Sequence, residues 1–209
     1  MDSTWLIDGP AKPGLTVVLA HGAGAPMDTP FMDLTAKTLA EADLRVVRFE
    51  FPYMRRRRTE GKKPGPDRPP VLTKAWHDCV TSLDVPTHQV IIGGKSMGGR
   101  IATLCADTLG VAGVACLGYP FHPVGRPETL RVEHLLTLRT PCFIAQGDRD
   151  SMGTRTEVES YRLPASFDVH WLPDGDHSFK PRKASGHSFE QNVSRAATAL
   201  ASFARRIGG

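Results

Sequence analysis

Short apolar runs alternate along this chain with segments of helical length, from about residue 15 to the end. The runs are rich in β-branched or apolar residues and lie at 16–20, 45–49, 89–93, 113–117, 142–146 and 168–172. Nearly continuous apolar runs are typical of strands that are covered on both faces, and strands that alternate with helices form parallel sheets. The segments between them predict helices at about 30–42, 71–83, 97–109, 154–162 and 186–206. The pattern therefore predicts an α/β protein with a mostly parallel central sheet flanked by helices.

The size and composition of the chain favour one globular domain over residues 1–209. Hydrophobic residues make up 40% of the chain and charged residues 23%, and no stretch approaches the roughly 18 apolar residues of a membrane span. The first ten residues lack the basic start and apolar run of a secretory signal, so we expect a cytoplasmic protein that does not bind membranes. The four cysteines form no closely spaced pair, which indicates reduced core residues rather than a metal site.

The net charge of +4 comes from one segment. Residues 54–68 contain seven basic and two acidic residues, including the run Arg55 to Arg58. Because the rest of the chain is close to neutral, bulk charge gives little reason to expect nucleic-acid binding. The prolines of residues 52–70 predict an exposed, basic, proline-rich loop with no regular element.

Ser96 lies in a pattern that is typical of a catalytic nucleophile. It follows the run 89–93, precedes the predicted helix 97–109, and has Gly94 and Gly98 two residues away on either side. A nucleophile at a sharp strand-to-helix turn needs small neighbours, because adjacent backbone passes close by. A phosphate-binding loop is the alternative for Gly94-Lys95-Ser96, but Gln89 stands where that motif requires its first glycine.

A serine hydroxyl needs a base to take its proton, and a carboxylate commonly orients that base. Downstream, Asp148 and Asp150 follow the run 142–146, and His177 lies in a polar loop after the run 168–172. The order serine, acid, histidine predicts Ser96 as nucleophile, Asp150 as orienting acid and His177 as base. Asp148 is the close rival of Asp150, and the other acids near the predicted site stay open as alternatives: Asp174 and Asp176.

Acyl transfer also needs donors for the developing oxyanion. The backbone amide of Met97, directly after the nucleophile, is the first predicted donor. The second is expected in the glycine-containing loop after the run 16–20, at Ala23 or its rival Gly24, and His21 is expected to fix that loop.

Four strings in the chain resemble a known family: residues 21–25 (His-Gly-Ala-Gly-Ala), 51–54 (Phe-Pro-Tyr-Met), 93–100 (Gly-Gly-Lys-Ser-Met-Gly-Gly-Arg) and 119–123 (Tyr-Pro-Phe-His-Pro). The chain resembles the small α/β-hydrolase-like family related to dienelactone hydrolases, which includes the hydrolase-like domain of subunit three of the nonspecific-lethal acetyltransferase complex. The resemblance spans about residues 15–205 and implies an α/β-hydrolase fold with Ser96, Asp150 and His177 as the triad. Dienelactone hydrolases use a cysteine nucleophile, so their substrate is not transferred to a chain with a serine there. The short interval between the runs ending at 117 and beginning at 142 predicts no cap domain.

These observations predict a serine hydrolase that cleaves a carboxylic ester or thioester through an acyl-enzyme, as a monomer or homodimer. The expected partner is a small-molecule acyl substrate, and no cofactor, metal or nucleic acid is implied. Gly24, Lys95 and His122 are expected to bind substrate. Lys95, Arg100 and the arginine run favour an anionic acyl group. Alternatively, Lys95 and Arg100 pair with local acids or backbone, and the arginine run is only a solvated loop. A catalytically weak or inactive binding or scaffold protein with the same fold is the alternative.

Overall fold

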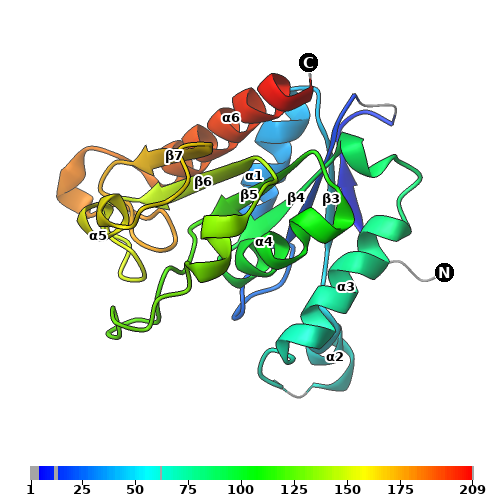
Figure 1. The fold of residues 1–209 in the computed structure, drawn as a ribbon, viewed down its shortest axis with the longest axis horizontal. Coiled ribbons are helices and arrows are strands. Elements are labelled where there is room, and N and C mark those ends of the chain that lie inside the picture. Colours follow the sequence, from blue (N-terminus) through cyan, green and yellow to red (C-terminus); the bar gives the residue numbers. More distant parts are fainter. Residues whose placement is uncertain (1–4, 12–13, 62, 209) are drawn as a thin grey trace.

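In the computed structural model, which describes residues 5–11, 14–61 and 63–208, a seven-stranded sheet runs in the order β1-β3-β2-β4-β5-β6-β7 (Figure 1). Its first strand, β1 (Leu6–Asp8), pairs antiparallel with β3, and all other neighbours are parallel. The other strands are β2 (Thr16–Ala20), β3 (Arg45–Phe49), β4 (Val90–Lys95), β5 (Gly113–Leu117), β6 (Cys142–Gly147) and β7 (Phe167–Leu172). The six predicted strands and the mostly parallel sheet are confirmed.

Six α-helices connect or flank the strands within the described residues: α1 (Pro30–Glu41), α2 (Pro52–Glu60), α3 (Pro69–Thr81), α4 (Met97–Leu109), α5 (Arg155–Ser160) and α6 (Phe189–Gly208). Three short 3₁₀ helices are η1 (Thr87–Gln89), η2 (Glu133–Thr137) and η3 (Lys183–Ser185). All five predicted helices are present, with their ends shifted by at most a few residues.

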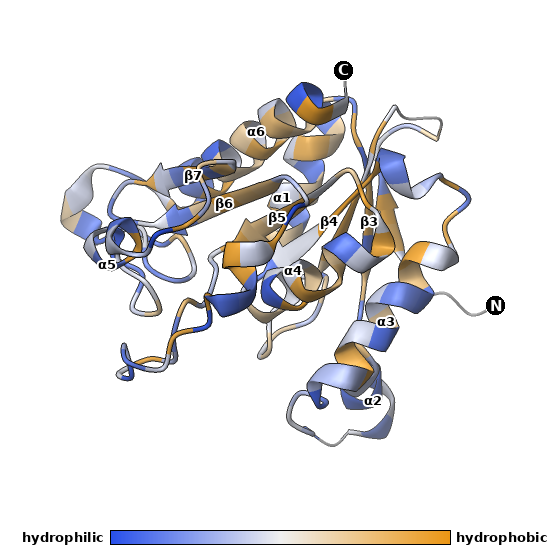
Figure 2. Cartoon of the chain, viewed as in Figure 1, coloured by the Kyte–Doolittle hydropathy of each residue, from blue (hydrophilic) through white to orange (hydrophobic). Residues whose placement is uncertain are grey.

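The sheet separates two apolar layers. Along β2, Val17 packs with α1 and α6, whereas its neighbour Val18 packs with α3 and α4. This alternation follows from the pleat, because successive side chains of a strand point to opposite faces. Figure 2 shows the consequence, with hydrophobic central strands and hydrophilic residues on the outer helices. Because strands β2 to β7 are parallel, their carboxyl ends meet at one edge of the sheet, where α/β proteins assemble their sites.

The prediction of a structureless loop over residues 52–70 is wrong for its first half, where α2 forms a regular helix. Pro52 is compatible with a helix because it occupies the first turn, where a backbone N–H needs no intrahelical acceptor. The arginines that follow favour helix formation. Tyr53 and Met54 are buried against the core, so this segment is part of the packed structure; Lys62 of the predicted loop lies outside the described residues.

Residues 118–141, between β5 and β6, contain only the short helix η2 and add no cap domain over the sheet edge. None of the helices in the described ranges is sufficiently long and apolar to cross a membrane. The four cysteines are free and buried, as the sequence predicts. Residues 1–4, on which the expectation of no secretory signal depends, lie outside the described residues.

Candidate active site

Ser96 lies at a strained turn between Lys95, the last residue of β4, and Met97, the first residue of α4. Its backbone φ of 50° and ψ of −113° are unusual for a residue other than glycine. A Cβ atom on Gly98 would lie 2.5 Å from the carbonyl oxygen of Ala20, so the helix can pass β2 this closely only with glycine there. The strand, turn and helix that were predicted around Ser96 are present in that order.

The side chain of His177 contacts both of the residues predicted to act with it. Its Nε2 atom lies 2.8 Å from the Ser96 hydroxyl, and its Nδ1 atom lies 2.7 Å from Oδ2 of Asp150. The carboxylate is fully buried, whereas the imidazole is 25% exposed. The three side chains come from the ends of β4, β6 and β7, which lie far apart in the sequence and meet at the carboxyl edge of the sheet.

Asp150, rather than its rival Asp148, faces the imidazole. The carboxylate of Asp150 also accepts hydrogen bonds from the side-chain amide of Gln146 at 2.9 Å and the backbone amide of Met152 at 2.8 Å. The carboxylate of Asp148 instead accepts a bond from the backbone amide of Asp174 at 3.0 Å. Three donors on one buried carboxylate fix its position and stabilise its charge.

The other two candidate acids stabilise the loop that carries His177. Asp174 pairs with Arg149 and Arg182, and the hydrogen bond from Arg182 lowers the pKa of this carboxyl to about 2. Asp176 accepts bonds from the backbone amides of Ser178 and Lys180 at 2.7 and 3.0 Å. None of these contacts involves the imidazole of His177. Asp174 and Asp176 therefore hold the loop in place and do not orient the base.

The loop after β2 lies directly beside the turn at Ser96. In the sheet, Ala20 pairs with Gly94, and a Cβ atom on Gly22 would lie 3.8 Å from Cβ of Ser96. Ala23 and Gly24 both line the cavity in front of the serine. The amide of Met97 belongs to the first turn of α4, where backbone N–H groups have no intrahelical acceptor. Both predicted donor segments are therefore adjacent to Ser96.

His21 is a buried part of this loop. Its Nδ1 atom lies 2.7 Å from the carbonyl oxygen of Gly22, and its Nε2 atom accepts a hydrogen bond from the backbone amide of Phe51 at 3.2 Å. Burial lowers the pKa of the imidazole below its ordinary value. A neutral ring with its hydrogen on Nδ1 satisfies both contacts, so His21 fixes the loop, as the sequence predicts.

An open cavity of about 920 Å³ lies in front of Ser96 and His177. Its polar lining includes Lys95, Lys180 and Glu190. Its apolar wall comes from the loop after β2, the start of α1 and three later segments: Pro26, Pro30, Phe31, Met32, Val124, Met152 and Phe189. A cavity of this kind suits an apolar group joined to the reacting carbonyl.

Lys95 reaches from β4 beneath the His177 loop. Its ammonium donates a hydrogen bond to the carbonyl oxygen of His177 at 2.6 Å and lies 5.6 Å from the ring centres of both Phe31 and Phe179. Burial lowers the pKa of Lys95 to about 8, partly offset by the negative charge of Asp150. Lys95 thus lines the predicted site, but its ammonium is also engaged in holding the backbone of His177.

The expectation that His122 lines the substrate cavity is wrong. Its side chain is buried, with Nδ1 lying 2.9 Å from the carbonyl oxygen of Pro123 and Nε2 lying 3.6 Å from the carboxylate of Glu157 on α5. The neighbouring Val124 lines the cavity instead. The expectation rested on the position of His122 after β5, but the ring contacts Glu157 of α5 and is not part of the cavity lining.

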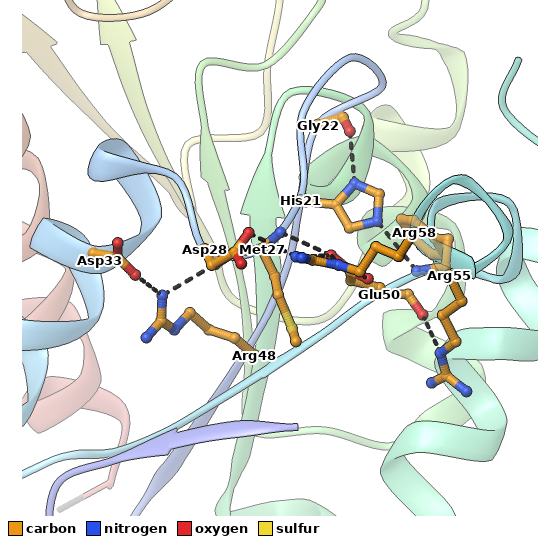
Figure 3. A network of polar contacts seen from close by, with 10 residues as sticks. His21, Gly22, Met27, Asp28, Asp33, Arg48, Glu50, Arg55 and Arg58 are labelled. Carbon is orange, nitrogen blue, oxygen red and sulfur yellow. Dashed lines mark hydrogen bonds and ion pairs between the residues drawn. The ribbon is translucent and has the colours of Figure 1, made fainter. Parts of the chain in front are cut away.

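The four arginines of α2 pair within the protein and do not line the cavity. Arg58 binds the buried carboxylate of Glu50 through three contacts of 2.7, 2.8 and 2.9 Å, and it also pairs with Asp28 (Figure 3). The others have local partners as well: Arg55 bonds the carbonyl of Glu50, Arg56 bonds Asp67, and Arg57 bonds the carbonyls of Pro64 and Gly24. The expectation of a solvated loop is therefore wrong, because each arginine of the helix has a partner within the chain, and none of them lines the cavity in front of Ser96.

Two buried charges of one strand segment clamp the loop that leads from β2 to α1. The backbone amide of Met27 donates to Glu50 at 3.3 Å, and the carbonyl of Met27 accepts from Arg48 at 3.0 Å (Figure 3). Arg48 pairs in addition with Asp8 and Asp33. Because both backbone polar groups of Met27 are held, the loop that forms this wall of the cavity is fixed to β3 and the segment after it.

A second hydroxyl and imidazole lie together in the structure, away from the cavity. The hydroxyl of Thr103 on α4 lies 2.9 Å from Nε2 of His134 in η2. Thr103 is buried, and no carboxylate within the described residues pairs with His134. Neither residue lines the cavity, so this pair lacks the access and the third group that Ser96 and His177 have.

Two residues that contact the site received no role from the sequence. Gln146 orients Asp150, and its signal was a polar side chain within an otherwise apolar strand, four residues before the acid. The hydroxyl of Tyr53 donates a hydrogen bond that the carbonyl oxygens of Gly22 and Ala23 share. Tyr53 lies in a string that marked the family resemblance, but nothing in the spacing connects it with a loop 30 residues earlier.

A family model described as an alpha/beta hydrolase domain matches residues 13–205 of this chain. The chain belongs to the alpha/beta hydrolase family. The predicted fold, with a mostly parallel sheet flanked by helices and no cap domain, is confirmed by this match and by the topology above.

Solved structures with the same fold include several hydrolases. An alpha/beta hydrolase enzyme from the metagenome of sediments of the Mar Chica lagoon in Morocco aligns with a TM-score of 0.71 and 17% identity, over 99% of this chain and 96% of that chain. A serine hydrolase without a lid from Xanthomonas campestris aligns with a TM-score of 0.67 and 20% identity, over 97% and 88%. A dienelactone hydrolase from Anabaena variabilis aligns with a TM-score of 0.67 and 19% identity, over 97% and 90%. At these identities the likeness concerns the fold.

Proposed function

We propose that this protein is a serine hydrolase that cleaves a carboxylic ester or thioester through an acyl-enzyme intermediate. The observation that carries the proposal is the pair of short contacts made by His177, 2.8 Å to the hydroxyl of Ser96 and 2.7 Å to the carboxylate of Asp150. A nucleophile, a base and an orienting acid in this order are the parts that acyl transfer requires.

In the proposed reaction Oγ of Ser96 attacks the carbonyl carbon of the substrate, and Nε2 of His177 takes the hydroxyl proton. The carboxylate of Asp150 stabilises the imidazolium that forms. The amides of Met97 and Ala23 donate hydrogen bonds to the carbonyl oxygen as it gains negative charge. When the tetrahedral intermediate collapses, His177 gives the proton to the leaving alcohol or thiol, and the acyl group stays on Ser96.

Deacylation repeats these steps with water. His177 removes a proton from a water molecule that attacks the acyl carbonyl, and the same proton returns to Oγ of Ser96 as the carboxylic acid leaves. No cofactor or metal takes part in this scheme. The open, apolar cavity supports a small-molecule substrate whose acyl or alcohol part is apolar. Proteins with the same fold include an esterase domain from Rhodothermus marinus and the serine hydrolase from Xanthomonas campestris, which also supports the proposal.

The test combines a fluorophosphonate probe with a panel of p-nitrophenyl esters and acyl thioesters of increasing chain length. We expect the native protein to be labelled and to turn over at least one substrate, and we expect Ser96→Ala to lose both reactions while it unfolds at a similar temperature. Thr103→Ala is the matched control, because it removes the other hydroxyl that contacts a histidine. A native protein that neither labels nor turns over any substrate would overturn this proposal in favour of the alternative, a non-catalytic binding or scaffold protein.

A further inference from the structure

Three successive carbonyl groups of the loop after β2 accept hydrogen bonds from side chains of α2. Helix α2 lies in the segment for which the sequence predicted a basic loop. The hydroxyl of Tyr53 lies 3.2 Å from the carbonyl oxygen of Gly22 and 3.0 Å from that of Ala23, so its single hydrogen is shared between the two. Arg57 donates to the next carbonyl, that of Gly24, at 3.4 Å. This loop carries the second predicted oxyanion donor.

Peptide geometry gives these contacts a consequence for the opposite side of the loop. In a trans peptide the C=O and the following N–H point in opposite directions, and the described residues contain no cis peptide bond. A carbonyl of Gly22 that points toward Tyr53 therefore turns the N–H of Ala23 away from α2. The carbonyl of Ala23 also points toward Tyr53, so the N–H of Gly24 is turned away from α2 as well.

The side of the loop that faces away from α2 is the side of the cavity. Ala23 and Gly24 line that cavity together with Ser96, whereas Tyr53 and Arg57 do not. The amides that Tyr53 turns away from the helix are thus directed to the region where the carbonyl oxygen of a bound ester would lie, beside Ser96.

Tyr53 is suited to hold this geometry. Its side chain is fully buried, its backbone amide donates to Asp67 at 2.9 Å, and the guanidinium of Arg57 lies 5.1 Å from its ring centre. Burial raises the pKa of Tyr53 to about 12, so the hydroxyl keeps its proton and remains a donor at neutral pH. Tyr53 is therefore held at three points: its backbone amide, the face of its ring and its hydroxyl.

We infer that Tyr53 is a positioning residue for the oxyanion donors, and that α2 serves to hold the loop from Gly22 to Gly24 with its amides facing the substrate carbonyl. The inference rests on the proposed hydrolase function and goes beyond it, because it assigns a catalytic purpose to a residue that touches neither the substrate nor the triad. Tyr53 shares the carbonyl of Gly22 with His21, which approaches it from within the same loop.

The experiment compares Tyr53→Phe with the matched control Tyr119→Phe. Both tyrosines are fully buried and both donate to backbone carbonyls, but the hydroxyl of Tyr119 contacts Arg131 instead of the loop after β2. For the best p-nitrophenyl ester of the panel we expect Tyr53→Phe to lower kcat about 10-fold with KM within twofold. This is less than the roughly 100-fold typical of removing an oxyanion donor, because the amide is loosened and not deleted. Tyr119→Phe should keep the native kcat.

A loss confined to kcat is the result that a purely structural role would not give, and amide spectra show whether the loop itself is loosened. In ¹H–¹⁵N spectra we expect the Ala23 and Gly24 signals to shift or broaden in Tyr53→Phe and to stay in place in Tyr119→Phe. If Tyr53→Phe is recovered unfolded, Arg57→Gln takes its place, with a fall in kcat of at least twofold as the supporting result.

The outcomes separate this inference from the function on which it rests. A native protein without turnover or labelling overturns both. An active native protein whose Tyr53→Phe variant matches Tyr119→Phe in kcat overturns the inference alone, and so does an unchanged kcat in Arg57→Gln where that variant is needed.

Discussion

The carboxylate of Asp150 lies 2.7 Å from Nδ1 of His177 and is itself fully buried, held by Gln146 and Met152. This arrangement keeps a hydrogen on Nδ1 and leaves Nε2 as the acceptor that faces Ser96. A fixed tautomer is the property that a general base needs here, because the opposite tautomer would present a donor to the serine hydroxyl.

Replacing Asp150 with asparagine should therefore abolish most of the activity without unfolding the protein. The amide can donate to Nδ1 and stabilise the wrong tautomer, and it supplies no charge for the imidazolium. We expect kcat to fall by about 10³- to 10⁴-fold, as is typical of such a change in a Ser-His-Asp site. The measurement is ester turnover, with the melting temperature recorded in parallel.

Asp148→Asn is the control for this prediction. Its carboxylate holds the backbone of Asp174 and does not touch the imidazole, so we expect a small loss of stability and at most a 10-fold loss of kcat. A larger loss of kcat in Asp148→Asn than in Asp150→Asn would contradict the assignment of the acid.

The sequence predicted the parts of this molecule that depend on local pattern. Strand and helix positions follow from runs of apolar residues, and the order of Ser96, Asp150 and His177 follows from where those runs end. Asp150 could not be separated from Asp148 in this way. The two carboxylates lie two residues apart in one loop, and only the path of that loop decides which of them reaches His177.

The elements missed by the sequence depend on contacts between distant segments. Residues 52–60 looked like a broken, basic loop, but Pro52 fits the first helical turn and each arginine finds a partner elsewhere in the chain. Strand β1 has only three residues and depends on pairing with β3. His122 was placed by its neighbours in sequence, whereas its ring direction is set by packing against α5.

Lys95 provides a prediction about the pH dependence of stability. Burial lowers its pKa to about 8 in the folded protein, compared with about 10.4 in an unfolded chain. Between these values the unfolded state binds more protons, so this residue makes the free energy of unfolding rise with pH. Below about pH 8 both states carry the charge, and the folded state bears the full cost of burying it.

We therefore expect the stability of the native protein, relative to Lys95→Met, to increase as the pH is raised from 7 to 10. Urea unfolding of both proteins at several pH values in this range measures the difference, in which the titration of all other groups largely cancels. Parallel stability curves for the two proteins would mean that Lys95 has an ordinary pKa in the folded state.

Gly98→Ala tests the close approach of α4 to β2. Helix propensity alone predicts that alanine stabilises the helix by about 1 kcal/mol. The added Cβ, however, would lie 2.5 Å from the carbonyl oxygen of Ala20 and 2.7 Å from that of His21, and neither backbone atom can move without shifting β2. Overpacking typically costs up to about 3 kcal/mol, so we expect a net loss of about 2 kcal/mol and a sharp fall in ester turnover.

Gly65→Ala is the matched control, because an added Cβ there meets no atom within 4 Å. Its free energy of unfolding should stay within about 0.5 kcal/mol of the native value. If Gly98→Ala proved as stable as Gly65→Ala in thermal unfolding, the tight packing at the turn would not be a constraint.

Arg58→Met tests whether the arginine run has a structural role. The change would leave the carboxylate of Glu50, which is 3% exposed, without its cation. Breaking a fully buried pair costs about 3–5 kcal/mol. Since the Arg58 side chain is 42% exposed, we expect a smaller loss of about 2 kcal/mol in urea unfolding. Arg126→Met removes the same charge from an exposed loop residue and should cost less than about 0.5 kcal/mol.

Salt distinguishes this contact from an ordinary surface ion pair. At 1 M NaCl the Debye length is about 3 Å, so interactions between exposed charges are largely screened, whereas a charge as buried as Glu50 is screened much less. The difference in stability between Arg58→Met and Arg126→Met should therefore persist at high salt. If it disappeared, the pair of Glu50 and Arg58 would behave as an ordinary surface ion pair, and the arginine would have no structural role in holding Glu50.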